Sequence, residues 1–214
     1  ALESARAMLD DPELKALAAD EIAALEAERE RLDGEFGVQS RNEADDKWLV
    51  WHDPLTGPTR ALLYDRTAGT LEAFYVTRPE LEGAPLRPMH PLEIPSRDGL
   101  TLVSYLTLPP GSDPDAAGKP PPAVTLVLLV HGGPWARDGY GFNRMHQLLA
   151  NRGYAVMSVN FRGSTGFGKA FINAGNLEWG ARMHDDLIDA VDWAVAQGIA
   201  QKDKVAIMGG SYGG

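Results

Sequence analysis

Three apolar strands separated by helix-forming segments constrain this chain more than any other feature of its sequence. Residues 123–130, 154–160 and 204–208 are nearly continuous hydrophobic runs of strand length. Segments with helical patterning, at about 144–152 and 177–197, lie between them. A strand that is apolar on both sides must be covered on both faces, so this alternation predicts an α/β fold with a mostly parallel sheet and helices on both faces.

The helix predicted over 177–197 has an apolar side and an acidic cluster. Its apolar residues recur every four positions and are predicted to face the sheet: Trp179, Met183, Leu187, Val191 and Val195. Asp185, Asp186 and Asp189 form the acidic cluster, which has the spacing i, i+1, i+4. Hard cations usually take more oxygen ligands than these, so the cluster is predicted to be solvated or to cap the helix rather than to bind a metal.

The first part of the chain has a different pattern. Residues 12–32 are predicted to form a helix, and three short aromatic and β-branched runs at 48–51, 61–64 and 71–76 are predicted to form a meander of strands. A proline-rich connector follows at 79–91. Two further strands, 90–95 and 100–108, are expected to pair in antiparallel fashion around the turn at Asp98 and Gly99.

Composition and charge exclude several classes of function. Residues 1–46 contribute a net charge of −9 to the total of −10, and this acidic stretch is predicted to be a solvated helix surface. The nearly neutral remainder offers no basic face, so no nucleic-acid partner is expected. The absence of cysteine excludes disulfides, cysteine-zinc sites and thiol catalysis. No apolar run approaches the ~20 residues that cross a bilayer, so no membrane partner is expected. The chain begins at Ala1 without a methionine, so further residues are expected to precede it and the localisation is unknown.

A G-x-S-x-G motif at 209–213 follows directly on the last apolar strand. In this pattern a serine stands on a sharp strand-to-helix turn, and glycines two positions before and after it let neighbouring backbone approach without a Cβ clash. The sequence therefore indicates that Ser211 is a catalytic nucleophile. A purely structural turn is the alternative, because the chain contains 23 glycines.

A second glycine loop, His131–Pro134, comes at the end of an earlier apolar strand. Acyl transfer requires backbone N–H groups that stabilise the negative oxygen of a tetrahedral intermediate. The expected donors of this oxyanion hole are the N–H groups of Gly133 and of Tyr212, the residue after the nucleophile. His131 is predicted to order the loop by its side chain, and Pro134 cannot contribute because it has no N–H.

Arg162 and the glycines that follow it form a third candidate loop. No G-x-x-x-x-G-K-[ST] pattern is present, so phosphate binding is not indicated, and Arg162 is predicted to brace the loop beneath the active site by hydrogen bonds. Every other histidine, namely His52, His90, His146 and His184, precedes Ser211 in the chain.

Taken together, these segments resemble the prolyl oligopeptidase family of serine peptidases (S9), in particular its acylaminoacyl-peptidase and dipeptidyl-aminopeptidase-like branch. The resemblance spans about residues 90–214 and rests on five segments: His131–Trp135, Asn160–Phe171, Trp179-Gly180, Met183–Trp193 and Met208–Gly214. Related lipases and esterases usually carry an HGGG loop and a GDSAGG-type turn, which this chain lacks.

The resemblance implies a division into two domains. Residues 1–88 would be the end of an N-terminal β-propeller with a helical insertion, and residues 89–214 the first part of an α/β-hydrolase domain that stops just after the nucleophile turn. It implies a Ser–Asp–His triad in that order, so the Asp and His would follow Gly214, and the chain alone is expected to be inactive.

The resemblance also implies short peptide substrates, with no metal and no cofactor, and leaves the oligomeric state open. An esterase or amidase of the same fold is one alternative, and a non-catalytic truncated module is another.

Overall fold

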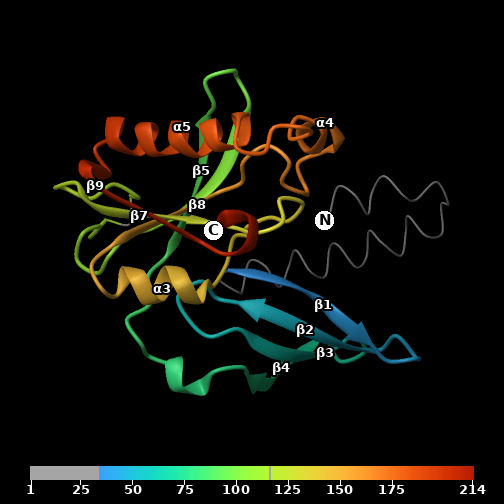
Figure 1. The fold of residues 1–214 in the computed structure, drawn as a ribbon. Helices are drawn as coiled ribbons and strands as arrows, with labels where there is room; N and C mark the ends of the chain where they lie inside the picture. Colours follow the sequence, from blue (N-terminus) through green and yellow to red (C-terminus); the bar gives the residue numbers. More distant parts are fainter. Residues whose placement is uncertain (1–33, 116) are drawn as a thin grey trace. The chain divides into compact units, whose positions relative to one another are not determined.

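The computed structural model describes residues 34–115 and 117–214, which divide into two compact units after Glu82 (Figure 1). The helix predicted over 12–32 lies outside the described residues. The propeller assignment of the first part of the chain stays a prediction.

The first unit is an antiparallel sheet whose four strands pair in chain order. Its strands are β1 (Glu35–Arg41), β2 (Lys47–Asp53), β3 (Arg60–Asp65) and β4 (Thr70–Val76), and a short 3₁₀ turn, η1 (Pro79–Leu81), follows them. The sequence predicts β2, β3 and β4. It does not predict β1, in which only two residues are apolar and the others are a glycine and four polar residues.

Alternation along β2 explains the small core of this sheet. Trp48 and Val50 point to the buried side together with Leu62 of β3, whereas Lys47 and Trp51 are exposed. The indole Nε1–H of Trp48 donates to Asp45 Oδ1 at 2.8 Å, so the polar atom of this buried ring is satisfied.

The second unit is a five-stranded sheet with the order β5-β6-β8-β7-β9. Its strands are β5 (Met89–Pro95), β6 (Thr101–Thr107), β7 (Val124–Val130), β8 (Ala155–Val159) and β9 (Ala200–Gly209). As predicted, β7, β8 and β9 are parallel, and β5 and β6 form an antiparallel pair that joins the sheet beside β8.

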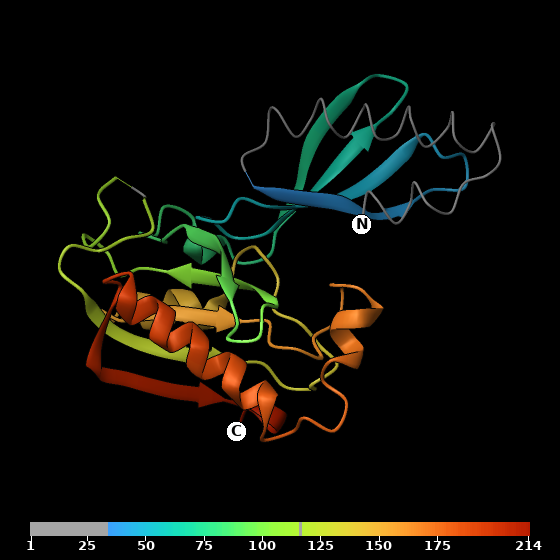
Figure 2. The same ribbon diagram turned by 90° about the horizontal axis from the view of Figure 1, so that it is seen from above.

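Helices cover both faces of this sheet, as predicted (Figures 1 and 2). Helix α3 (Arg144–Ala150) packs against β6 and β8 on one face, and α5 (Arg182–Ala196) packs against β5 and β9 on the other. The short helix α4 (Lys169–Asn173) follows the Arg162 loop and is not predicted from the sequence. Among the described residues, no helix is both long and apolar enough to span a membrane.

The start of α5 corrects one prediction. The helix begins at Arg182, because Leu177 and Gly180 adopt left-handed conformations with φ of +62° and +67° that a right-handed helix cannot contain. Trp179 therefore lies before the helix and is 56% exposed, so the prediction that it faces the sheet is wrong. Met183 and Leu187 are buried against the sheet as predicted.

Candidate active site

The three parallel strands of the second unit end at the same edge of the sheet. β7 ends beside β9, where Val130 pairs with Gly209, and beside β8, where Leu129 pairs with Ser158. The loops that follow these strands therefore start side by side, although they are far apart in the sequence. Ligands of open α/β sheets bind at this carboxyl edge, so it is the place to look for a site.

Ser211 stands on a sharp turn at the end of β9. Its φ is +59°, a strained value for a residue with a Cβ, and the short 3₁₀ turn η2 (Ser211–Gly213) begins there. The Gly213 N–H donates to the Gly210 carbonyl at 3.0 Å and closes this turn. The backbone thus has the strand-to-helix geometry that the G-x-S-x-G motif predicts.

The glycines around Ser211 are required by close backbone contacts. A Cβ at Gly209 would overlap the Gly213 carbonyl oxygen, and a Cβ at Gly213 would overlap that of Val130. A Cβ at Gly132 would lie 3.2 Å from Ser211 Cβ and 3.7 Å from Ser211 Oγ. The loop after β7 therefore lies directly against the serine.

His131 fixes the conformation of that loop. The proton on its Nδ1 is donated to the Gly132 carbonyl oxygen at 2.7 Å. In a trans peptide the C=O and the following N–H point in opposite directions, so this bond turns the N–H of Gly133 away from the imidazole ring. Gly133 has φ of +126°, and a Cβ there would lie 2.7 Å from the Trp135 nitrogen, so no other residue fits.

Phe161 connects the His131–Pro134 loop with the Ser211 turn, and no motif in the sequence identifies it. Its ring stacks on His131 with centroids 4.5 Å apart and also contacts Tyr212 at 5.4 Å. Ser164 lies beside both residues: its hydroxyl donates to the Phe161 carbonyl at 2.6 Å, and its Oγ lies 3.0 Å from His131 Nε2. The only available signal in the sequence is an aromatic residue directly after a buried strand.

Arg162 is buried and paired with two carboxylates. Its backbone N–H, Nε and Nη2 all donate to Asp186 of α5, at 2.6 to 2.9 Å, and Nη1 and Nη2 each donate to Asp98 at 2.8 Å. The hydrogen bonds to Asp186 and Asp98 raise the pKa of the guanidinium, and the same contact holds the pKa of Asp98 well below its usual range. Arg162 therefore ties the loop after β8 to α5 and to the β5–β6 turn.

The acidic cluster on α5 is divided between two arginines. Asp186 is fully buried against Arg162, so the prediction of a solvated or capping residue is wrong for this position. Asp185 and Asp189 are partly exposed and pair with Arg97 at 3.1 and 2.8 Å. In the part of the chain that the structure describes, no group of three or more ligating side chains could hold a metal ion.

His146 lies in the core on α3, away from the serine turn. Its Nδ1 is 3.0 Å from Thr107 Oγ1 and its Nε2 is 2.7 Å from Ser158 Oγ. Burial lowers the pKa of His146 to about 4. This histidine links α3 to β6 and β8 and has a structural role.

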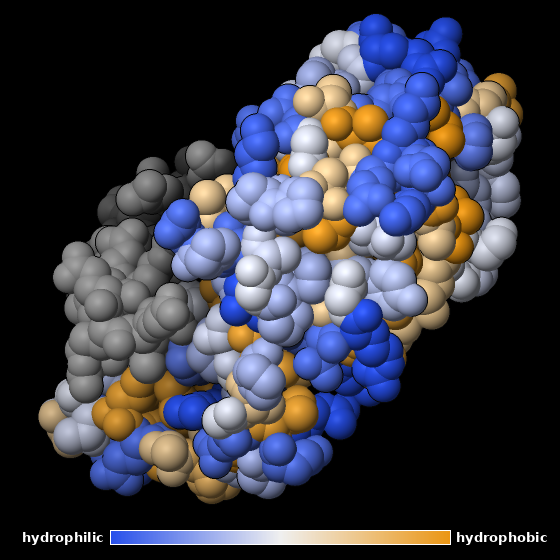
Figure 3. Space-filling model, turned by 90° about the vertical axis from the view of Figure 1, so that its left-hand side faces the viewer, coloured by the Kyte–Doolittle hydropathy of each residue, from blue (hydrophilic) through white to orange (hydrophobic). Residues whose placement is uncertain are grey.

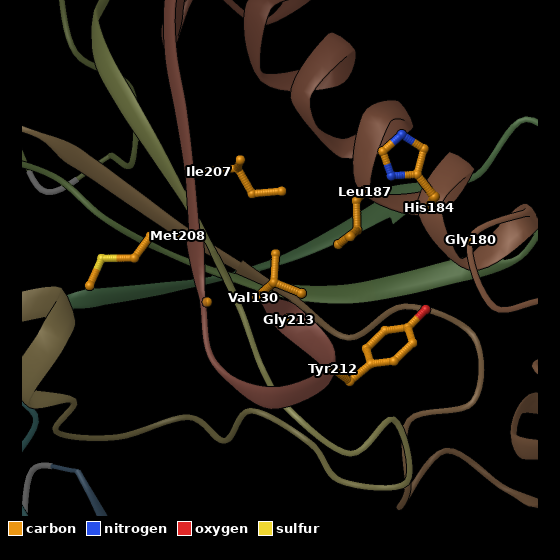
Figure 4. A pocket seen from close by; sticks show the side chains of 10 residues that line it. Val130, Gly180, His184, Leu187, Ile207, Met208, Tyr212 and Gly213 are labelled. Carbon is orange, nitrogen blue, oxygen red and sulfur yellow. The ribbon is translucent and has the colours of Figure 1, made fainter.

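A pocket of about 620 Å³ lies between β9 and α5, beside the serine turn (Figure 4). Val130, Leu187 and Ile207 converge on it, with His184 and the ring of Tyr212 at its border. The Tyr212 hydroxyl contacts Met183 Sδ at 3.6 Å, and burial raises the pKa of this phenol. The pocket is thus mainly apolar.

Comparison with known proteins shows which family this chain resembles. Residues 140–214 match the prolyl oligopeptidase family. The chain is 58% identical over 195 residues to dipeptidyl aminopeptidase BIII of Pseudoxanthomonas mexicana, an alignment that covers 89% of the chain and 28% of that relative. It is 45% identical over 195 residues to dipeptidyl peptidase family member 6 of Caenorhabditis elegans, with 85% of the chain and 26% of that protein covered.

A solved structure agrees with these relatives. A puromycin-hydrolyzing peptidase of Mycobacterium tuberculosis superposes with a TM-score of 0.67 at 27% sequence identity, over 78% of this chain and 25% of that one. The chain thus spans about a quarter of the length of the proteins it matches. Residues 140–214, which come after the His131–Pro134 loop and include the Ser211 turn, thus place this part of the chain in the prolyl oligopeptidase family.

Proposed function

We propose that the protein to which this chain belongs is a serine peptidase that cleaves short peptides through an acyl-enzyme on Ser211. The observation that carries this proposal is the strained φ of +59° at Ser211, with the backbone of Gly132 packed against its side chain. A turn of this kind exposes a nucleophile next to a loop that can supply an oxyanion donor. The peptidase names of the relatives support the same reaction class.

The reaction follows from these positions. Ser211 Oγ attacks the scissile carbonyl carbon as its proton passes to a histidine base, and the carbonyl oxygen becomes an oxyanion. The N–H groups of Gly133 and Tyr212 stabilise that oxyanion by hydrogen bonds. When the C–N bond breaks, the leaving amine takes the proton from the histidine, and water then hydrolyses the acyl-enzyme by the reverse proton path.

Two residues, His131 and Arg162, position the groups of the proposed active site without taking part in the reaction. His131 orients the Gly132–Gly133 peptide through the bond to the Gly132 carbonyl. Arg162 fixes the position of Phe161, on which both His131 and Tyr212 rest. Both are positioning residues in this proposal, since neither is required to touch the substrate.

The histidine base and the aspartate that orients it are proposed to follow Ser211 in the full protein, as the chain order of the family implies. Of the described histidines, His131 is committed to its loop and His146 is buried in the core. The four-stranded sheet β1–β4 is proposed to be a blade from the end of a β-propeller, since propeller blades are four-stranded antiparallel sheets. A propeller above the site would admit short peptides and exclude folded proteins.

Turnover by the full protein tests this proposal. The wild-type protein should hydrolyse blocked or free aminoacyl p-nitroanilides, and Ser211→Ala should reduce kcat by several orders of magnitude, because the nucleophile is lost. Hydrolysis of p-nitrophenyl esters with no activity on any anilide would support an esterase instead. Turnover that survives Ser211→Ala would contradict the role of the serine.

A further inference from the structure

Large hydrophobic side chains reach the surface of the described chain in several patches, some of which are visible between hydrophilic residues in Figure 3. Three of these side chains gather at the carboxyl edge of the second unit. Trp135 is 59% exposed, Trp179 is 56% exposed and Leu177 is fully exposed. Such a cluster of exposed apolar side chains marks a place of contact with another molecule or segment.

These side chains border a hollow of about 490 Å³, which is the size range of sites for small ligands. It is lined by Trp135, Gly175, Asn176, Leu177 and Trp179. None of these residues is charged, and Asn176 provides the single polar side chain. The two indole rings contact each other with centroids 5.9 Å apart at an angle of 55°, so they form one aromatic wall of the hollow.

The wall that carries Leu177 is a defined turn. The N–H of Glu178 donates to the Gly175 carbonyl at 3.2 Å, and that of Ala181 donates to the Glu178 carbonyl at 3.1 Å. Behind this turn the backbone packs so tightly that a Cβ at Gly175 would lie 2.8 Å from Gly163 Cα. The hollow is therefore preformed, which lowers the entropy cost of binding.

Leu177 itself combines two unfavourable features. Its φ of +62° is rare for a bulky residue, and its side chain gains no burial from that conformation because it is fully exposed. Strained residues of this kind persist where the surrounding structure holds them, and they concentrate at functional sites. The strain directs an apolar side chain to the rim of the hollow, which suggests a role in binding.

Two walls of the hollow adjoin residues of the candidate active site. The Trp179 ring meets the Tyr212 ring edge-on at 5.3 Å, and Tyr212 is the residue after Ser211. Trp135 follows Gly133 by two positions. Both proposed oxyanion donors thus lie next to a wall of the hollow, and a carbonyl held by these donors would place its neighbouring side chains within reach.

We propose that this hollow is a subsite that binds a large apolar side chain of the peptide substrate, one or two residues from the scissile bond. The proposal rests on the proposed peptidase function. It names the walls Trp135 and Trp179 and the rim residue Leu177 as determinants of specificity. The occupant is inferred from the uncharged aromatic lining and from the contact between Trp179 and Tyr212.

The subsite is tested by measuring kcat/KM of the full protein for matched peptide substrates. Two series of fluorogenic peptides would vary the residue on either side of the scissile bond from Ala to Leu to Phe. Trp135→Ala and Trp179→Ala should each lower kcat/KM for the preferred Leu or Phe peptide by about 10- to 200-fold relative to the Ala peptide of the same series, mainly through KM. Leu177→Asn, which keeps a residue tolerant of positive φ, should shift the preference in the same direction without lowering the thermal unfolding midpoint.

Tyr154→Ala is the matched control, because Tyr154 is an exposed aromatic residue that precedes β8 at the opposite end of that strand. It should leave the Phe-to-Ala preference unchanged. The rate at which a small fluorophosphonate labels each variant reports whether the serine turn is intact, so a variant that fails to fold is recognised directly. Equal loss on all peptides, or an unchanged preference in both tryptophan variants that still react, would overturn the subsite.

A binding measurement separates the subsite from the catalytic proposal. In the Ser211→Ala protein, the better Leu or Phe peptide should bind at least 10-fold more tightly than its Ala counterpart, and Trp179→Ala should abolish that difference. If wild-type turnover does not depend on Ser211, the proposed function fails, whatever the peptides bind. If turnover depends on Ser211 but neither tryptophan affects peptide preference, only the subsite fails. A hollow filled by another segment of the protein or by a second copy would give this last result.

Discussion

Arg162 carries a charge into the interior of the second unit, where two carboxylates from distant parts of the chain pair with it. Only 3% of its side chain is exposed, and Asp186 is fully buried. A buried ion pair gains little over apolar packing, but removing one partner leaves the other charge buried without compensation. Removal of the Arg162 side chain would therefore leave the charge of Asp186 buried and unpaired.

Arg162→Met should destabilise the second unit by about 3–5 kcal/mol, because Asp186 would remain buried without its partner. Denaturant unfolding followed by tryptophan fluorescence measures the loss. Arg97→Met is the matched control, since Arg97 pairs with Asp185 and Asp189 on the same helix but is half exposed, and solvent screens those pairs. Equal effects of the two substitutions would contradict the special role of the buried pair.

At the scale of elements, α3 is attached to the sheet by polar contacts as well as by apolar packing. His146 lies between Thr107 of β6 and Ser158 of β8, and burial lowers its pKa to about 4. The unfolded chain binds a proton on this histidine at about pH 6.5, so between pH 6.5 and 4 the unfolded state holds more protons than the folded state. The stability that neutral His146 supports is present above pH 6.5 and decreases as the pH falls.

The free energy of unfolding should fall by about 2 kcal/mol between pH 7 and pH 5 through His146 alone. The variant His146→Gln should lack this component, so its stability should depend less steeply on pH in that range. Chemical denaturation at both pH values measures the difference. His184→Gln removes an exposed histidine from α5 as the control, and an equal change of slope in both variants would contradict the assignment.

The periodicity of the sequence predicts the elements of the parallel sheet well, because their apolar runs depend only on local residues. It does not predict β1, whose burial is weak, or the late start of α5, which depends on left-handed residues at 177 and 180. The glycine spacing around Ser211 also predicts the turn correctly. The pairing of Arg162 with Asp98 and Asp186 could not be predicted, since it joins residues that lie 64 and 24 positions away.

At the scale of the whole molecule, the chain contains one part of the proposed machinery. It spans about a quarter of the length of these two curated relatives, and the histidine base is proposed to follow Ser211 in the full protein. A nucleophile without its base retains little activity. The isolated 214-residue chain should therefore show no Ser211-dependent hydrolysis of p-nitroanilides under conditions in which the full protein turns over. Turnover by the isolated chain that disappears in Ser211→Ala would contradict this account.

The identity of the nucleophile is the claim on which the proposed function and the subsite both depend. Incubation of the full protein with a fluorophosphonate, followed by proteolysis and tandem mass spectrometry, locates the modified residue. The account predicts a single adduct on Ser211, absent from Ser211→Ala and unchanged in rate in Tyr154→Ala. An adduct on another residue, or none on a protein that hydrolyses peptides, would contradict it.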